Sequence, residues 1–397
     1  MQLRYCKQSL AIAWWQLRHQ KAQTLAAIVG IAFTTVLLFM QIGFRSSFIG
    51  SLVQFPKSFD CDIFIVSASS VTVLRPLPFS ERRLYQVLGV EGVESVSPTY
   101  INSFLWRDPR DRSLFLRQVM GIGFPLNSRF FEAPGVADNL DKLKLNKSVL
   151  IDERSRPEFA PIIDLFRQQG KTIEEIKTSS QGGLHRIKVV GLFELGTSTS
   201  FDASIVMSKS TFLSLFDRHP SQIDWGLVRV KPGYDVDEVT ERIREYLPND
   251  VRAFSKADVL NKERNFYEYR TPLGLIFRFG LLASVVVGII ILYQILYVKI
   301  AQSIQEYATL KAMGYSQQAL TLVVIGEASI LAVSGYIPGF LASCWMYEFL
   351  ETATQMIFVM RLDVAIAVLV SISFICFVSG GLAVGKLKEA DPADIFG

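Results

Sequence analysis

Long apolar runs separated by polar intervals dominate the pattern of this chain. Four windows contain no Asp, Glu, Lys or Arg over about the 20 residues that a helix needs to cross the hydrocarbon core of a bilayer; they are Ala22–Phe44, Phe279–Val298, Ala328–Tyr347 and Val364–Gly385. With their flanking residues, these windows predict transmembrane helices at 22–44, 273–298, 317–347 and 364–385. A mixed interval, 45–272, separates the first two helices and is long enough for one or two folded domains.

The first 21 residues carry a weaker apolar pattern. Leu3, Leu10 and Leu17 recur at a spacing of seven residues, with Trp14 beside them. We therefore expect a cytoplasmic amphipathic helix at 1–21 that lies on the membrane surface. A basic tail in contact with lipid headgroups is the alternative. The apolar run that follows exceeds a typical signal-peptide core and no small-residue cleavage site closes it, so we interpret it as an uncleaved helix.

Composition and charge support this topology. Half of the 397 residues are hydrophobic and one fifth are charged, which is too apolar for an ordinary soluble protein of this size. Much of the positive charge outside the 45–272 interval lies near the apolar windows: Arg4, Lys7, Arg18, Lys21, Lys299, Lys311, Lys386 and Lys388. The positive-inside rule therefore places both termini, the 299–316 loop and the 386–397 tail in the cytoplasm, with 45–272 and the acidic 348–363 loop outside. A net charge of +4 and the lack of a basic run with interleaved aromatics argue against nucleic-acid binding.

The outer interval mixes strand and helix patterns, so we expect an α+β domain. An order of strand, helix and strand occurs near each end, at about 60–108 and again at about 223–255. A different region with Gly/Ser-rich turns, about 110–222, lies between these two repeat units. The pattern predicts one subdomain built from both repeat units, with a second subdomain inserted between them.

Candidate catalytic and cofactor motifs are scarce. Three histidines, His19, His185 and His219, lie far apart without metal-ligand spacing. Gly170–Lys171–Thr172 resembles the end of a phosphate-binding loop, but the glycine required five residues earlier is Leu165, so we interpret it as a turn. One sequence leaves paired catalytic carboxylates open. We expect no enzyme activity and no cofactor in this chain, and therefore an external source of energy.

Residues 299–316 form a polar, helix-favouring interval between two apolar ones. Within it, Ile304, Tyr307 and Leu310 lie close to one side of a helix, and Gly314 supplies a C-terminal stop. We predict a cytoplasmic helix to which a partner docks. A solvated turn between two transmembrane helices is the alternative.

The third predicted transmembrane helix contains an acid and two spaced glycines. Glu327 lies about ten residues past Ser316, at a depth of roughly 15 Å, where burial of a carboxylate is costly. It serves either as a proton or substrate contact or, as we favour, as an interhelical hydrogen bond that fixes packing. Gly335 and Gly339 form a small-xxx-small step that lets another helix approach closely.

Three stretches resemble known permeases: QEYATLKAMGYS at 305–316, IGEASILAVSGYIPG at 325–339 and the ending KLKEADPADIF. Together with the order of spans and outer domain, they resemble the ABC permeases of the MacB/FtsX/LolC superfamily over nearly the whole chain. The opening AWWQLRHQKAQTLAAIVGIAF is most similar to DevC-type permeases of cyanobacterial glycolipid exporters.

The resemblance implies an α-helical membrane protein with four transmembrane helices and a MacB-like periplasmic core between helices 1 and 2, located in the bacterial cytoplasmic (inner) membrane. It implies a homodimer, an ABC ATPase subunit (DevA-like) that uses ATP and Mg, a membrane-fusion or periplasmic adaptor protein (DevB-like) and, indirectly, a TolC-like outer-membrane channel. It places ATPase coupling on the cytoplasmic segment, at Gln305, Glu306, Tyr307, Leu310, Lys311, Met313 and Gly314. The family often has arginine ahead of this glutamate, whereas Ser303 and Gln305 occupy that stretch here.

The function implied is that of a permease subunit in a tripartite efflux system. Strokes of the ATPase are transmitted mechanically to the periplasmic domain, and a lipid-like or amphipathic substrate such as a glycolipid is exported. Two alternatives stay open, a lipoprotein-release permease and an FtsX-like regulator of cell-wall hydrolases. The sequence leaves undetermined the substrate, the adaptor-binding residues, the role of Glu327 and whether the output is transport or regulation.

Overall fold

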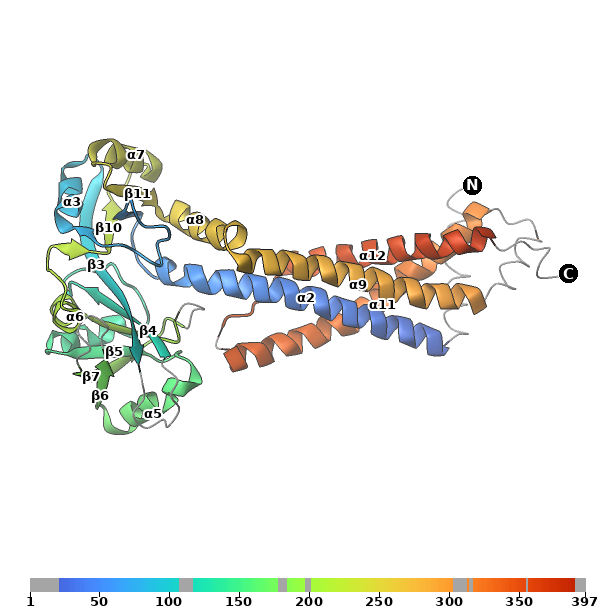
Figure 1. Ribbon diagram of the computed structural model, residues 1–397, viewed down its shortest axis with the longest axis horizontal. Coiled ribbons are helices and arrows are strands. Elements are labelled where there is room, and N and C mark those ends of the chain that lie inside the picture. Colours follow the sequence, from blue (N-terminus) through green and yellow to red (C-terminus); the bar gives the residue numbers. More distant parts are fainter. Residues whose placement is uncertain are drawn as a thin grey trace. The chain divides into compact units, whose positions relative to one another are not determined.

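Figure 1 shows the computed structural model of the chain, which describes residues 21–106, 117–177, 184–196, 201–302, 313, 317–354 and 356–389. The chain divides into two compact units. The helical unit comprises 1–46, 273–350 and 358–397, and the α+β unit comprises 47–272 and 351–357. Each unit is described below by itself.

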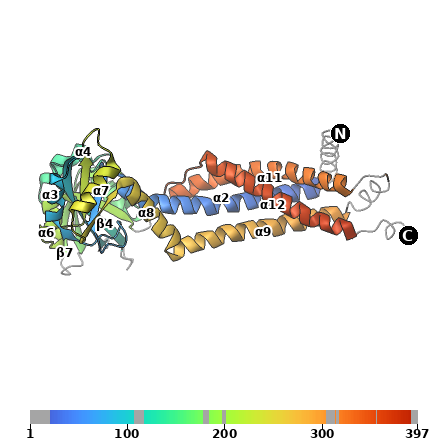
Figure 2. The ribbon, with the colours of Figure 1, turned by 90° about the horizontal axis from the view of Figure 1, so that it is seen from above.

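Four helices among the described residues are long and apolar enough to cross a membrane. They are α2 (Lys21–Lys57), α9 (Pro272–Gln302), α11 (Gln317–Thr354) and α12 (Leu362–Glu389). Within the helical unit they run alongside one another (Figure 2). The helices extend past the predicted boundaries at 44, 298, 347 and 385. A charge-free window marks only the part that suits hydrocarbon, whereas helical hydrogen bonding continues into polar sequence until the chain breaks it.

The outward side of α11 carries an apolar stripe. Val333, Ile337, Leu341, Trp345 and Phe349 recur at four-residue spacing, and each side chain is more than half exposed. Residues at this spacing lie on one face of a helix. An exposed row of large apolar side chains is suited to contact with lipid.

The α+β unit is built on a sheet in which nine of the described strands have the order β11-β1-β10-β3-β4-β8-β5-β7-β6. Strands from the two repeat units lie together at one end: β1 (Ile63–Ser67), β3 (Val93–Trp106), β10 (Trp225–Val230) and β11 (Val251–Ser255). Strands from the intervening region form the other end: β4 (Arg117–Phe124), β5 (Ser148–Asp152), β6 (Thr172–Lys177), β7 (Leu184–Phe193) and β8 (Ala203–Ser208). The two regions therefore share one continuous sheet.

Strand β3 joins the two ends of the sheet. Its first part, Val93–Thr99, pairs with β10, and its second part, Tyr100–Trp106, pairs with β4. Most pairs are antiparallel, but β4 with β8 and β5 with β7 are parallel. The sequence pattern predicted several of these strands but not the parallel pairings, because parallel neighbours are distant in the chain and need crossover connections.

Both faces of the sheet are buried. In β1, Ile63 and Ile65 belong to one hydrophobic cluster, whereas Phe64 and Val66 belong to another. Successive side chains of a strand point to opposite faces, so each cluster covers one face. This double burial explains why β1, β5 and β8 are buried along their whole length.

Helices and shorter elements complete the α+β unit. They are α3 (Glu81–Gln86), α4 (Val136–Asn139), α5 (Ala160–Gln169), α6 (Lys209–Phe216), α7 (Val236–Tyr246), α8 (Lys256–Tyr269), the short strands β2 (Phe79–Ser80) and β9 (Gln222–Ile223), and the 3-10 turns η1 (Val87–Gly89), η2 (Leu140–Lys144) and η3 (Pro157–Phe159). Asp235 caps the N-terminus of α7, because its side chain accepts hydrogen bonds from the backbone N–H groups of Asp237 and Glu238. Gly170 caps α5 in the left-handed region at φ 70°, and β6 begins two residues later at Thr172, so the Gly-Lys-Thr sequence connects a helix to a strand.

Asp152 is a fully buried carboxylate at the end of β5. It accepts hydrogen bonds from the backbone N–H groups of Arg154 (3.0 Å), Leu195 (3.0 Å) and Gly196 (2.8 Å). Burial raises the pKa of Asp152 from 3.8 to about 6 although these donors oppose the shift. The folded state therefore binds the proton more tightly than the unfolded state, and the contribution of Asp152 to stability is full below about pH 4 and declines as the pH rises through 6.

We expect the Asp152 carboxyl group to titrate with a midpoint near pH 6. The measurement is the pH dependence of its carboxyl-carbon NMR signal in the detergent-solubilised full-length chain. The Asp152→Asn variant identifies the signal, which should be absent there. A midpoint near pH 4 would show that the three N–H donors fully offset desolvation and would contradict the expected shift.

Candidate functional site

The predicted ATPase-coupling segment lies largely outside the described residues. This applies to Gln305, Glu306, Tyr307, Leu310, Lys311 and Gly314. Met313 is described and its side chain is 65% exposed. The structure also describes the helices on either side of the segment, with α9 ending at Gln302 and α11 beginning at Gln317.

A buried ion pair joins these two flanking helices. Lys299 Nζ of α9 lies 3.0 Å from Glu327 Oε2 of α11, and the side chains are only 3% and 2% exposed. The cytoplasmic segment predicted from the sequence begins at Lys299, whereas α9 continues to Gln302 and the lysine side chain is buried. The sequence did not predict the burial of this lysine, because its carboxylate partner is distant in the chain.

The electrostatics of this pair favour a structural link between α9 and α11. Removing two charges from water is costly, and their attraction offsets that cost only when both remain in place with good geometry. Glu327 was expected to contact a neighbouring helix, and the structure provides Lys299 as that contact. A change in the spacing or rotation of α9 relative to α11 would separate the charges, so the pair couples the two helices that flank the predicted docking segment.

Close helix packing surrounds the two predicted glycines of α11. A Cβ atom on Gly335 would lie 2.5 Å from Cβ of Ile31, and one on Gly339 would lie 2.6 Å from Cβ of Thr35. Both distances are far below van der Waals contact, so any larger residue would push α11 away from α2. The close approach expected from the small-xxx-small step is therefore made by α2.

A second row of small residues, missed in the sequence analysis, lies on α9. Cβ atoms built on Gly280 and Gly288 would lie 2.5 Å from Oε1 of Gln41 and 2.5 Å from Cγ2 of Thr34, both in α2. Ser284, midway between them, is buried and bonds to its own helix through the carbonyl of Gly280. The repeat Gly280, Ser284 and Gly288 has the same four-residue spacing as the row on α11, and this spacing was the available signal.

Helix α12 completes the helical unit. Ser379 Oγ donates to the carbonyl of Ile289 in α9 at 3.1 Å, and Tyr336 OH of α11 donates to the carbonyl of Ala365 in α12 at 3.0 Å. Among the described residues, no group of three or more His, Cys, Asp and Glu side chains could hold a metal ion. The described part of the site is a packed junction of α2, α9, α11 and α12.

We expect Lys299→Gln and Glu327→Gln each to lower the stability of the helical unit by about 3 kcal/mol or more, because each leaves one buried charge without its counter-charge. The double variant Lys299→Met/Glu327→Leu should recover most of this loss. The measurement is the thermal unfolding of the full-length chain in detergent, with Glu348→Gln, an exposed site on the same helix, as the control. A double variant less stable than both single variants would contradict the ion-pair argument.

Two family profiles match the chain. The profile described as "MacB-like periplasmic core domain" matches residues 24–246, and that described as "FtsX-like permease C-terminal" matches residues 278–392. No curated protein matches.

Solved structures similar to this chain include the periplasmic region of MacB from Actinobacillus actinomycetemcomitans, at 14% identity and a TM-score of 0.33, covering 52% of this chain and 94% of that one. The extracellular domain of the noncanonic ABC-type transporter YknZ from Gram-positive bacteria matches at 11% identity and a TM-score of 0.32, covering 49% and 98%. A domain of a putative permease protein from Porphyromonas gingivalis matches at 16% identity and a TM-score of 0.29, covering 50% and 89%.

The MacB-like profile alone spans more than half of the 397 residues, and the FtsX-like profile takes in most of α9 and all of α11 and α12. The chain therefore belongs to the MacB/FtsX-like permease family, as a membrane-embedded ABC transporter component with an extracytoplasmic α+β domain.

Proposed function

We propose that this chain is the permease subunit of an ATP-driven tripartite efflux system that exports a lipid-like or amphipathic substrate, with a glycolipid as the leading class. The observation that carries the proposal is helix α2, which is unbroken over 37 residues and belongs to both units of the chain. One stiff helix with tight packing in each unit is suited to transmitting a displacement.

In the α+β unit, the end of α2 is anchored in an aromatic cluster. The ring of Phe55 lies 5.0 Å from that of Trp225, and the ring of Phe59, just after the helix, lies 5.3 Å from both. Trp225 Nε1 donates to the carbonyl of Val73 at 2.9 Å, which fixes the indole. All three aromatic side chains are almost fully buried. A shift of the helix end therefore moves the core of this unit.

In the helical unit, α2 packs through carbon atoms at Thr34 and Thr35. The hydroxyls of Thr34 and Thr35 bond to carbonyls of their own helix, at Gly30 (2.9 Å) and Ile31 (2.8 Å), and so do not line a polar path. The neighbouring glycines of α9 and α11 meet carbon atoms of these threonines. This arrangement favours the mechanical transmission of ATPase strokes to the extracytoplasmic domain over the passage of a hydrophilic substrate between these helices.

Family membership implies an ABC ATPase partner, which we place on the 299–316 segment with ATP and Mg bound by that partner. We further propose a homodimer in the cytoplasmic (inner) membrane, with cytoplasmic termini, a DevB-like adaptor on the outer domain and a TolC-like channel beyond it. The nonpolar outward stripe of α11 is consistent with a membrane-embedded assembly.

Mass spectrometry after gentle solubilisation from native membranes tests the assembly, because it identifies co-purifying proteins and lipids together. We expect an ABC ATPase, a membrane-fusion protein and an enriched glycolipid. A cell-wall hydrolase in place of the fusion protein would instead support an FtsX-like regulator. Lipoproteins without a fusion protein would support a lipoprotein-release permease.

We expect Leu310→Glu to abolish association with the ATPase, because it places a charge on the apolar side of the predicted docking helix. The measurement is the amount of ATPase recovered with the affinity-purified permease. Ala308→Glu is the matched control, since it adds the same charge about 200° away around a helix. If Leu310→Glu recovers as much ATPase as the unmodified chain, Leu310 is not part of the docking surface.

A further inference from the structure

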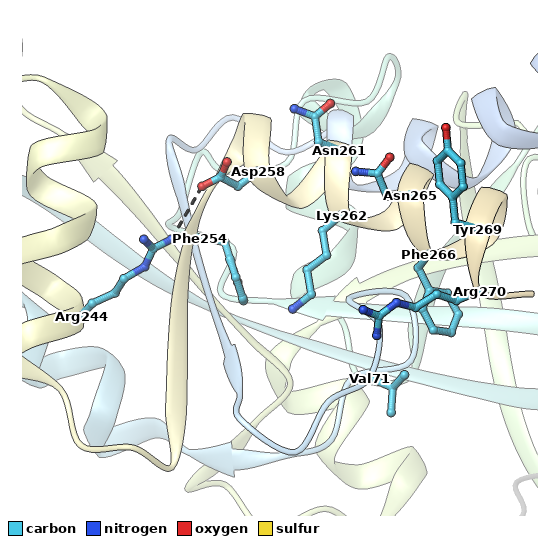
Figure 3. A pocket seen from close by; sticks show the side chains of 10 residues that line it. All are labelled: Val71, Arg244, Phe254, Asp258, Asn261, Lys262, Asn265, Phe266, Tyr269 and Arg270. Carbon is cyan, nitrogen blue, oxygen red and sulfur yellow. Dashed lines mark ion pairs between the residues drawn. The ribbon is translucent and has the colours of Figure 1, made fainter.

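A pocket of about 730 Å³ lies in the α+β unit beside helix α8. Its walls come from α8, from β11 and α7, and from the loop between β1 and β2, which contributes Val71. In Figure 3, Lys262 extends from one side of α8 toward Phe254 and Arg270 lies at the end of the helix near Phe266, whereas Asn261, Asn265 and Tyr269 extend from the other side. The pocket thus brings two cationic side chains to an apolar wall.

One cation of the pocket is already neutralised by neighbouring groups. Arg244 of α7 lies 2.5 Å from Glu241 and 3.6 Å from Asp258, and its Nε donates to the carbonyl of Ala253 at 2.8 Å. These contacts hold Arg244 in place and also use Asp258, the acidic residue of the pocket wall. Arg244 therefore shapes the pocket, and Asp258 does not cancel the charge of Lys262 or Arg270.

The side chains of Lys262 and Arg270 both line the pocket. Neither forms an ion pair with another residue in the part of the chain that the structure describes. Lys262 Nζ lies 4.0 Å from the ring centroid of Phe254. Burial, followed by repulsion from Arg252, lowers the pKa of Lys262, and the Glu263 carboxylate opposes this shift. An anion placed beside the ammonium group would stabilise its charged form further, so the pocket is electrostatically suited to a negative group.

The opposite wall is apolar and fixed. The carboxylate of the buried Glu263 accepts hydrogen bonds from the backbone N–H groups of Val73 and Leu74, which tie the loop to α8. Val71, two residues earlier, has a 70% exposed side chain. With Phe254 and Phe266 it gives the pocket an apolar surface next to the cations.

We propose that this pocket binds the anionic headgroup of an amphiphilic lipid, with Lys262 and Arg270 on the charged group and Val71, Phe254 and Phe266 along the apolar part. Its place in the chain supports a lipid, since Arg270 lies just before Pro272, the first residue of a helix with a candidate membrane span. The inference goes beyond the proposed function, because such a lipid can bind here whether it is cargo or a resident component.

The test measures binding of dihexanoyl phosphatidylglycerol to the detergent-solubilised full-length chain by native mass spectrometry. Dihexanoyl phosphatidylcholine and inorganic phosphate are the comparison probes. We expect the anionic lipid to bind most tightly, and Lys262→Gln/Arg270→Gln to weaken its binding at least about tenfold, since this variant removes both cations that would face the headgroup. Val71→Asp should also weaken binding by repulsion, whereas the similarly sized Val71→Asn should do so much less.

The matched control is Arg242→Gln/Arg264→Gln, which removes two cations from α7 and α8 that do not line the pocket. It should bind the anionic lipid like the unmodified chain. Equal affinity in the Lys262/Arg270 variant and the unmodified chain would overturn the proposal, as would equal binding of the zwitterionic lipid. If inorganic phosphate binds as tightly as the anionic lipid, the apolar part of the ligand does not contribute to binding, and the proposal of a lipid ligand is overturned. No ATPase or adaptor is present, so the result is independent of the export role.

Discussion

The close approach of α2 to two neighbouring helices is the constraint on which the helical unit depends. Lipid tails are as apolar as the helix surfaces, so the hydrophobic effect does little to hold transmembrane helices together, and dense packing must do so. Gly335 and Gly339 on one side and Gly280 and Gly288 on the other leave room only for the side chains of α2. The apolar stripe of α11 from Val333 to Phe349 faces outward instead.

The Lys299–Glu327 pair complements this packing with a different kind of specificity. A buried ion pair is sensitive to separation, since each charge has given up its hydration. The pair therefore favours one relative arrangement of α9 and α11, next to the segment where family membership implies that force enters.

The sequence was sufficient for the membrane windows, the outer α+β character and several strands, because these depend on local composition and periodicity. It was insufficient where the structure of a residue or strand depends on a contact with a residue or strand distant in the chain. Lys299 resembles a loop residue until Glu327 is placed beside it, and the parallel pairing of β4 with β8 has no local signature. The four-residue spacing of Gly280, Ser284 and Gly288 is present in the sequence, but it was not interpreted as a helix-packing site. The pocket beside α8 assembles residues from α7, β11, α8 and a loop, a juxtaposition that only the fold creates.

Strand β3 bears on how this domain can change during evolution. Its two consecutive parts pair with different partners, so adding or deleting one residue near Thr99 would shift one register relative to the other and turn side chains to the wrong face. Both faces are filled by close-packed clusters that leave no room for such a shift. Homologues that differ in length should therefore carry their insertions in the connections beyond β4, while the length of β3 stays constant.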